Sequence, residues 1–520
     1  MMDISVVNRV AIGDIIRRSA RRFPEKPSLI EDERILTFKE LDEMCNRFAN
    51  YLLDSDLVKG DKVATICGNS IEHAVVSYAT AKAGMIWVPI NPGVGLDEKT
   101  YILNETEPKL LIGDAAFIKR SFNELSKLCP FILFADEDSH GAGNTVQYVL
   151  EHQDQSEPDV HIEDRDVAQI MYTSGTTGNP KGVMISHLSV YISSLGNIIE
   201  SGYKQNSVAL AMMPMFHCAQ HAMLTTSLHH GNTIVILKGF DPEVFMQTVE
   251  KHRVTGMLAL PLMYRVLLDH PKRAQYDLSS LEKCMYAMAP MDKTTLERLI
   301  EAFDADFFLG TGQTEMYPAT MMFKPEEQLR RFGSYWGESS LLVDTAIMDD
   351  NGSVVPDGEV GEIVHRGPTV MNGYFNKEEA TEKSREFDWH HTGDLGYWDP
   401  DGQMVFVDRK KDMIKTGGEN VASIKVEETL FLYPKVANAS VAGLPHEHWI
   451  EAITAFVTPK PGESVTEREI IDHCAEHLGF FQVPKSVIFL QQLPATTTGK
   501  VKKNVLREEY KNHYLQAPSH

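Results

Sequence analysis

The stretch Asp164–Val183 reads DRDVAQIMYTSGTTGNPKGV and joins an apolar run to a loop rich in glycine and hydroxyl side chains. The apolar run, Val167–Met171, predicts a buried strand, and α/β sheets usually bind ligands at the carboxyl ends of their strands. Glycines let a backbone approach a ligand closely, while hydroxyls, backbone N–H groups and Lys181 can surround an anion. The residues after Gly178 depart from the Walker pattern, so the loop indicates a different kind of phosphate site. For this stretch alone, a hydroxyl-rich surface loop that binds nothing is the alternative.

The length and composition of the chain limit its class. At 520 residues it is too long for one core, so two or more domains are expected. A hydrophobic content of 43% is typical of a globular enzyme, and a net charge of −23 argues against a nonspecific nucleic-acid binder. Six scattered cysteines without a C-x-x-C pair indicate thiols in a reducing compartment. The N-terminus meets charge too early for a signal peptide and no apolar run reaches about twenty residues, which predicts a soluble, cytoplasmic protein.

Strand-like and helix-like patterns alternate along the first part of the chain. A helix is expected at EHAVVSYATAKAG (72–84), and strands are expected at MIWVPI, TIVILKG, GMLALP and KCMYAMAPM. This alternation predicts an α/β protein with doubly wound sheets. From about residue 343, Asn-Gly and Asp-Gly turns between short strands predict a small β-barrel or antiparallel sheet, placed at about 335–410. A new α/β pattern follows, so we expect a large N-terminal domain over 1–410 and a small, mobile α+β C-terminal domain over 411–520.

Five short motifs follow one another along the chain. They are YTSGTTGNPKG at 172–182, TGQTE at 311–315, HTGDLG at 391–396, DRKKDMIKTGGEN at 408–420 and TTTGKVKK at 496–503. In this order they resemble the motifs of the acyl- and aryl-CoA ligases, members of the adenylate-forming superfamily that also includes firefly luciferase and peptide-synthetase adenylation domains. The resemblance covers nearly the whole chain. It implies an enzyme that converts an acid and Mg-ATP to an acyl adenylate and pyrophosphate, then transfers the acyl group to coenzyme A and releases AMP.

The resemblance also assigns residues to ATP and magnesium. It implies that the hydroxyl loop and its lysine serve the leaving phosphates, that Thr314 contacts the α-phosphate, and that Glu315 holds Mg²⁺, which prefers oxygen ligands. Asp394 would accept the ribose hydroxyls beside Arg409. Outside the motifs, Glu315 would be a solvated loop acid and Asp394 a turn residue. The full set expected to hold the cofactors is Thr173, Ser174, Gly175, Thr176, Thr177, Gly178, Lys181, Ala289, Pro290, Thr311, Gly312, Gln313, Asp394, Arg409, Lys415, Gly417, Gly418 and Glu419.

The resemblance gives Lys500 a catalytic role in the first half-reaction. A compact ammonium on a long stem can contact the substrate carboxylate and the α-phosphate together. The alternative for this lysine is a solvated basic tail. In the family the C-terminal domain rotates after adenylation, with Lys411 at the hinge position. Gly417 and Gly418 would then let the pantetheine arm of coenzyme A pass close to the backbone.

One position departs from the family pattern at the nucleotide motif. The family usually has an aromatic residue where this chain has Thr311, and that residue stacks on adenine. Tyr286 and Met316 are the candidates to pack against the base instead.

His217 lies in PMFHCAQ at 214–220, a segment that resembles the lining of the family's acyl pocket. With Lys500, Thr314 and Glu315 it makes up the catalytic set that the resemblance implies. Amino-acid-activating relatives tend to place an aspartate at this position, so the histidine argues against amino acids. The surrounding pocket candidates are apolar: Met213, Met215, Cys218, Ala219, Met257, Leu258, Met285 and Met288. Methionines suit a flexible aliphatic ligand, so a medium- or long-chain fatty acid is the first expectation. If these methionines are only core residues, an aryl or short branched acid is open.

Two rival functions stay open at this point. One is an acyl-AMP ligase that loads a carrier protein instead of coenzyme A, and the sequence does not distinguish these acceptors. The other is an inactive nucleotide-binding relative, against which Lys181, Glu315, Asp394, Arg409 and Lys500 argue jointly. The expected partners are the acid, ATP and coenzyme A, without nucleic acid or a transmembrane segment. A peripheral membrane contact and a homodimer are left open.

Overall fold

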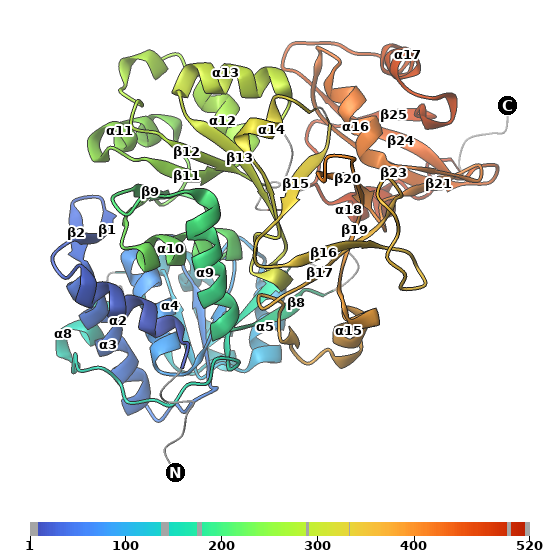
Figure 1. The fold of residues 1–520 in the computed structure, drawn as a ribbon. Coiled ribbons are helices and arrows are strands. Elements are labelled where there is room, and N and C mark those ends of the chain that lie inside the picture. The colour runs from blue at the N-terminus through green and yellow to red at the C-terminus, as the bar shows by residue number, and fades with distance from the viewer. Residues whose placement is uncertain are drawn as a thin grey trace. The chain divides into compact units, whose positions relative to one another are not determined.

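The computed structural model describes residues 9–136, 145–173, 179–287, 291–331, 333–496 and 501–514. The chain divides into two compact units, whose elements are labelled in Figure 1. Of the described residues, the first unit comprises those between 9 and 345 and those at 365–390, and the second comprises those at 346–364 and from 391 to 514. The domain boundary expected near residue 410 stays a prediction.

Two large, mostly parallel sheets form the frame of the first unit. The strands of the smaller sheet are β3 (Lys62–Ile66), β4 (Ile86–Pro89), β5 (Leu110–Gly113), β6 (Ile132–Phe134), β7 (Val167–Thr173), β8 (Lys181–Ser186) and β18 (Gly373–Tyr374). They run in the order β18-β8-β7-β4-β3-β5-β6, and β8 is antiparallel to both of its neighbours. The hydroxyl loop therefore connects two adjacent strands near one edge of this sheet.

The second sheet of this unit has a parallel centre with antiparallel flanks. Its strands are β1 (Pro27–Glu31), β2 (Arg34–Thr37), β9 (Val208–Ala211), β10 (Thr233–Ile236), β11 (Gly256–Ala259), β12 (Lys283–Tyr286), β13 (Asp306–Thr311), β14 (Met321–Phe323) and β15 (Tyr335–Ser339). The order is β15-β14-β13-β12-β11-β9-β10-β1-β2. The strands from β13 to β1 are parallel, while β14, β15 and β2 run antiparallel to their neighbours.

Helices cover both faces of each sheet. They are α2 (Ile12–Arg22), α3 (Phe38–Asp54), α4 (Ile71–Lys82), α5 (Leu96–Thr106), α6 (Ala115–Ile118), α7 (Phe122–Leu128), α8 (Val146–His152), α9 (His187–Ser201), α10 (Cys218–His230), α11 (Pro242–His252), α12 (Pro261–Leu268), α13 (Lys293–Phe303), α14 (Pro325–Gln328) and α15 (Glu378–Lys383). The largest core joins side chains of both sheets to α2, α3, α4, α9 and α10. A second core lies under α11, α12 and α13, and a third lies under α5, α6 and α7. This layering confirms the doubly wound α/β fold.

Local sequence signals explain where several helices begin. The Ser70 hydroxyl accepts a hydrogen bond from the His73 N–H (3.1 Å) and so caps α4. Asp292 caps α13 in the same way through the Thr295 N–H (2.8 Å). Such caps satisfy backbone donors that have no partner inside the helix. Within the described part of the chain, no helix is both long and apolar enough to span a membrane.

The second unit is built mainly from two further groups of strands. The first group is β16 (Asp344–Met348), β17 (Gly361–Arg366), β19 (His390–Trp398) and β20 (Met404–Arg409), which neighbour one another in this order. The order is open, so the strands for which the sequence predicts a small barrel or an antiparallel sheet are not closed into a barrel in the described residues. Short Asn-Gly and Asp-Gly turns fit either arrangement, because they fix a hairpin but not the closure of a sheet.

The C-terminal part of the second unit has its own sheet and core. Its strands are β21 (Ile414–Thr416), β22 (Glu419–Val421), β23 (Val436–His446), β24 (Ile450–Pro459) and β25 (Ser486–Phe489). The order is β22-β21-β24-β23, with β25 beside β24. Helices α16 (Ser423–Phe431) and α17 (Glu467–His477) bury apolar side chains against this sheet, and α18 (Lys503–Glu509) follows. A capping box formed by Thr466 and Glu469 starts α17.

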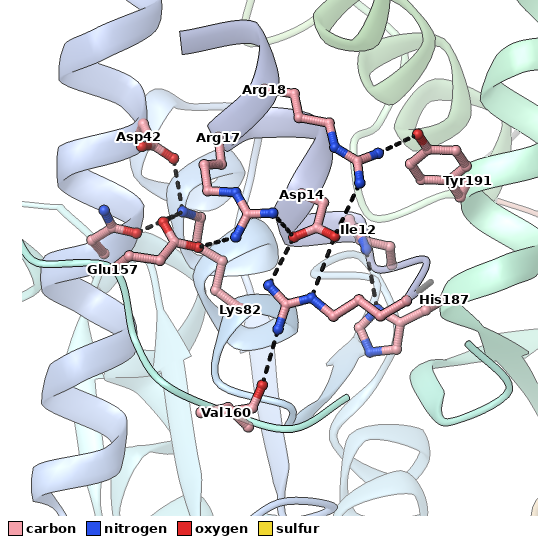
Figure 2. A network of polar contacts seen from close by, with 12 residues as sticks. Ile12, Asp14, Arg17, Arg18, Asp42, Lys82, Glu157, Val160, His187 and Tyr191 are labelled. Carbon is pink, nitrogen blue, oxygen red and sulfur yellow. Dashed lines mark hydrogen bonds and ion pairs between the residues drawn. The ribbon is translucent and has the colours of Figure 1, made fainter. Parts of the chain in front are cut away.

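A buried network of charges holds the first helix of the structure in place (Figure 2). The Asp14 carboxylate on α2 is only 3% exposed and forms an ion pair with the Arg17 guanidinium (2.7 Å). The Lys82 ammonium on α4, 1% exposed, contacts Asp42 of α3 at 2.7 Å and Glu157 at 2.9 Å. Arg17 also reaches Glu157 at 3.5 Å and joins the two groups. Since buried charges must be paired, this network ties α2, α3, α4 and the segment before β7 together.

Candidate active site

The hydroxyl loop leaves the sheet at Thr173 and returns at Lys181. These residues face each other in the antiparallel register of β7 and β8. Five residues assigned to phosphate lie outside the described residues: Ser174, Gly175, Thr176, Thr177 and Gly178. The Lys181 ammonium lies 4.7 Å from the centre of the Tyr374 ring, within the range of a cation–π contact. The strand pairing thus fixes the lysine beside an aromatic ring.

Tyr374 connects this lysine to the carboxylate that is expected to hold magnesium. β18 pairs with β8, and its Tyr374 hydroxyl donates a hydrogen bond to Glu315 Oε1 (2.9 Å). The Met371 N–H donates to the backbone carbonyl of Glu315 (2.8 Å), which fixes the main chain as well. Burial, and then the charge of Glu315, raise the pKa of Tyr374, so its hydroxyl stays protonated and donates. In sequence MNGY reads as a turn, so Tyr374 is not predicted.

His217 and Thr314 both contact one buried thiol, that of Cys218. His217 is the N-cap of α10, and its Nδ1 accepts from the Ala219 N–H at 3.3 Å. The next residue, Cys218, places Sγ 3.3 Å from Thr314 Oγ1 and 3.7 Å from His217 Nδ1. Burial raises the pKa of Cys218, but the neighbouring His217 and Thr314 outweigh it, and the pKa lies below its usual value. The structure therefore brings two residues of the predicted catalytic set to neighbouring positions.

A buried polar network supports the nucleotide motif from behind. Tyr317, two residues after Glu315, has a left-handed backbone (φ +46°), which is strained for a residue other than glycine. Its hydroxyl lies 2.5 Å from His221 Nδ1, and His221 Nε2 lies 3.3 Å from the Ser77 hydroxyl. Burial lowers the pKa of His221 to about 3, so the ring stays neutral. The network joins α4 and α10 to the motif, and sequence patterns give no sign of it.

The adenine side of the site differs from the expectation. Tyr286 and Met316, the candidates to pack against the base, are both fully buried, and the Tyr286 hydroxyl donates to Gln328 (2.7 Å). Neither offers an exposed face to a base, because each packs into the interior of the first unit. The buried Thr311 hydroxyl has no hydrogen-bond partner among the described residues. Gln313 contacts His390 at 3.3 Å, while Ala289 and Pro290 lie outside the described residues.

Asp394 and Arg409 of the second unit are brought together by strand register. They face each other across β19 and β20, and Arg409 Nε lies 3.1 Å from Asp394 Oδ1. Asp394 is 4% exposed, and its N–H donates to the Thr392 hydroxyl at 3.0 Å. The Arg409 N–H donates to Asp408, whose other oxygen accepts from the Ser423 hydroxyl (2.7 Å) at the start of α16. Hydrogen bonds to Thr392 and Asp408 therefore fix the backbone of both members of the pair that is expected to bind ribose.

The predicted coenzyme A residues occupy one hairpin. Lys415 and Glu419 lie on β21 and β22, and Gly417 and Gly418 form the turn between them. Both glycines have positive φ, +58° and +90°, as a tight mirror-image hairpin turn requires. A side chain at Gly418 would meet no atom within 4 Å, so this side of the turn is open. Lys500, the predicted lysine of adenylation, lies outside the described residues.

The apolar candidates for the acyl pocket separate into three environments. Met213, Ala219, Leu258 and Met285 come together in one methionine-rich cluster, which also contains Tyr203, Met223, Phe308 and Met322. Met215 and Cys218 belong to the core between the sheets, and Met257 points to the core under α11, α12 and α13. Met257 and Leu258 are adjacent on β11, so they face opposite sides of the sheet. Met288 lies outside the described residues.

Comparison with known proteins identifies the family. The AMP-binding enzyme model matches residues 16–375, and the AMP-binding enzyme C-terminal domain model matches 425–500. A feruloyl-CoA synthase from Amycolatopsis sp. is 32% identical over 95% of this chain and 98% of its own length. A long-chain fatty acid–CoA ligase from Mycobacterium tuberculosis is 31% identical over 96% and 98%. A 2-succinylbenzoate–CoA ligase from Bacillus cereus is 30% identical over 95% and 97%.

Solved structures give the same result. ATP-bound MatB from Rhodopseudomonas palustris superposes with a TM-score of 0.88 at 26% identity, covering 96% of this chain and 99% of that one. The o-succinylbenzoate CoA synthetase from Bacillus subtilis in complex with its acyl-adenylate intermediate has a TM-score of 0.85 at 28% identity, covering 95% and 97%. Both chains are matched over nearly their full length.

Proposed function

This chain belongs to the AMP-binding enzymes of the adenylate-forming acid–CoA ligase family, which use ATP, Mg²⁺ and coenzyme A, and we propose that its acid is a medium- or long-chain fatty acid. The observation that carries this proposal is the methionine-rich cluster beside α10. His217 caps this helix, so the cluster begins next to a residue of the predicted catalytic set. Flexible methionine side chains can make room for an aliphatic chain.

The chemistry of the cluster supports an apolar substrate. Its buried members are Tyr203, Met223, Leu258, Met285, Phe308 and Met322, with Met213, Ala219 and Ala287 packed against them. None of these side chains is charged, so an ammonium or a second carboxylate would be costly to bury there. An amino acid substrate is therefore disfavoured, in agreement with the histidine at 217.

We also assign the polar residues of the site to the adenylation step, from their contacts and their chemistry. Glu315 is half-buried and oriented by Tyr374, and a carboxylate of this kind suits Mg²⁺, which when bound neutralises charge on phosphate oxygens. Lys181 would bind the leaving phosphates and Thr314 the α-phosphate, because charge accumulates on these oxygens during the reaction. Asp394, held by Arg409, would accept the ribose hydroxyls. The Thr311 hydroxyl, which has no partner among the described residues, fits a further contact to the nucleotide.

An aromatic acid is the second candidate. The relative named feruloyl-CoA synthase and the relative named for 2-succinylbenzoate both match nearly the full chain. The cluster also contains two aromatic side chains, Tyr203 and Phe308, which could pack against a substrate ring. A short-chain acid as substrate, and a carrier protein in place of coenzyme A as acceptor, also stay open. For location, the six buried unpaired cysteines support a reducing, cytoplasmic compartment.

The test is AMP release over a panel of acids with ATP, Mg²⁺ and either coenzyme A or a carrier protein as acceptor. Burying one methylene contributes about 0.8 kcal/mol, so kcat/KM should rise about fourfold per methylene until the pocket is filled. Fatty acids should exceed amino acids by orders of magnitude. Equal rates for short and long fatty acids, or a clear preference for aromatic acids, would exclude the fatty-acid proposal. Formation of ADP and phosphate would exclude adenylation itself.

A further inference from the structure

A small cavity lies beneath α10, beside the first residues of β10 and β11. Its volume is about 10 Å³, which is room for one oxygen-sized group. The residues that line it are uncharged: Tyr203, Ala209, Leu210, Gln220, Met223, Leu224, Ser227, Ile234, Gly256, Met257 and Leu258. A cavity of this kind binds neutral groups, because a charge placed there would be desolvated without a counterion.

Two buried hydroxyls line this cavity without a hydrogen-bond partner. Tyr203 is 5% exposed and Ser227 is fully buried, and neither hydroxyl is bonded to any of the residues that the structure describes. The preceding hydroxyls on α10 differ, because Thr225 and Thr226 each donate to the carbonyl four residues earlier (2.9 and 2.7 Å). Leaving a buried hydroxyl unpaired is destabilising. Two such groups at one cavity indicate a ligand that supplies the missing hydrogen bonds.

The cavity adjoins the proposed acyl pocket at its far end. Gln220, Met223 and Ser227 lie on one face of α10, at i, i+3 and i+7. Ser227 lies about 15 Å along the helix from His217 at 1.5 Å per residue. Met223 and Leu258 line the cavity and also belong to the methionine-rich cluster. An acyl chain that starts near His217 and follows this face therefore ends at the two hydroxyls.

The position of the Tyr203 ring depends on a glycine in the neighbouring strand. A Cβ at Gly256, the first residue of β11, would lie 2.6 Å from a Tyr203 ring carbon and 2.7 Å from its hydroxyl oxygen. Real side chains do not approach this closely, so only glycine lets the ring lie against the strand at this depth. The Tyr203 ring thus lies where a side chain at position 256 would otherwise stand, and both residues line the cavity.

We infer that the acid carries a neutral oxygen, as a hydroxyl or a ketone, at the far end of its chain, and that Tyr203 and Ser227 bind this oxygen. The inference rests on the fatty-acid function proposed above and names its substrate class more narrowly. The Tyr203 hydroxyl donates to the substrate oxygen, and the Ser227 hydroxyl donates or accepts according to the group. Dicarboxylic acids are excluded because no cation lines the cavity.

The experiment compares straight-chain acids with the same acids bearing a terminal hydroxyl or a methyl ketone, by kcat/KM for AMP release. A site built to hydrogen-bond an oxygen rejects the analogue that lacks it, so the wild-type enzyme should prefer the oxygenated acid of matching length at least about tenfold. Tyr203→Phe removes one oxygen atom and should bring this preference close to unity, and Ser227→Ala should reduce it. Tyr264→Phe is the matched control, because Tyr264 packs in the core under α11, α12 and α13 and its hydroxyl donates to the Met285 backbone carbonyl (2.8 Å) instead of lining the cavity.

Thermal unfolding of each variant separates loss of preference from loss of fold. If the wild-type enzyme uses both members of every pair equally, or if Tyr203→Phe keeps the full preference, the cavity holds only a water molecule and the inference is wrong. The proposed fatty-acid function itself would be refuted by a different result, in which no fatty acid, oxygenated or plain, supports AMP release and an acid of another class does.

Discussion

The Glu315 carboxylate is oriented by a hydroxyl that lies 59 residues further along the chain. Tyr374→Phe removes this donor and keeps the ring beside Lys181. A hydrogen bond to a charged group contributes about 1.5–3 kcal/mol, so acyl-AMP formation should fall about ten- to a hundredfold and require more Mg²⁺. The measurement is ATP–pyrophosphate exchange as a function of Mg²⁺ concentration.

The control for this substitution is Tyr276→Phe, which also removes a tyrosine hydroxyl that donates to a glutamate (Glu243, 3.1 Å). It should leave the Mg²⁺ dependence unchanged. If Tyr374→Phe lowers the exchange rate equally at every Mg²⁺ concentration, Glu315 does not act through the metal.

Individual residues of the site were predictable only where a motif carries them. Thr314, Glu315, Asp394 and Arg409 occur in short segments whose letters indicate their roles, and strand register confirms that Asp394 and Arg409 are neighbours. Tyr374 could not be found in this way, since its role depends on the pairing of β18 with β8. Contacts of this kind arise from tertiary structure, and a single sequence contains no local signal for them.

Among the elements, α2, α3 and α4 share a network of buried and partly buried charges (Figure 2). Lys82→Met should lower the free energy of unfolding by about 1.5–3 kcal/mol, because it removes a buried ammonium that donates to Asp42 and Glu157, while these carboxylates (16% and 33% exposed) keep partial access to water. Lys59→Met is the control: Lys59 pairs with Asp166, but both side chains are partly exposed, so its loss should cost less than about 1 kcal/mol. Denaturant unfolding measures both. Equal losses in the two variants would show that burial of the network contributes nothing.

Element positions were predictable where the signal is local. The helix expected at 72–84 is α4, Ile71–Lys82, and the strand expected at Val167–Met171 is β7, Val167–Thr173. Helix caps, glycines that end helices and apolar runs act within a few residues, so the elements that they predict are found at the same positions in the folded protein. The order of strands in a sheet has no such signal. This is why the strands at 335–410 could be foreseen, but the choice between a barrel and an open sheet could not.

At the scale of the whole molecule, the proposed mechanism divides the two half-reactions between different parts of the C-terminal region. Lys500 is proposed to act in adenylation, by contacting two anions, and the Gly417–Gly418 turn is proposed to act in thioester formation. Lys500→Ala should slow acyl-AMP formation about 10²–10³-fold, by analogy with the loss of an oxyanion donor. It should still convert supplied acyl-AMP and coenzyme A to thioester at the normal rate. Single-turnover kinetics of each half-reaction measure this directly.

Gly418→Leu should give the opposite result. A side chain there projects into open space, where the pantetheine arm is proposed to pass, so acyl-AMP should form normally while thioester formation is blocked. The positive φ of Gly418 (+90°) also strains any other residue, and Gly462→Leu controls for this strain, because Gly462 has a similar φ (+82°) and equally open surroundings. If Gly462→Leu slows thioester formation as much as Gly418→Leu, the effect is strain and not obstruction. If Lys500→Ala and Gly418→Leu each slow both half-reactions equally, alternation of the C-terminal domain between two steps does not describe this enzyme.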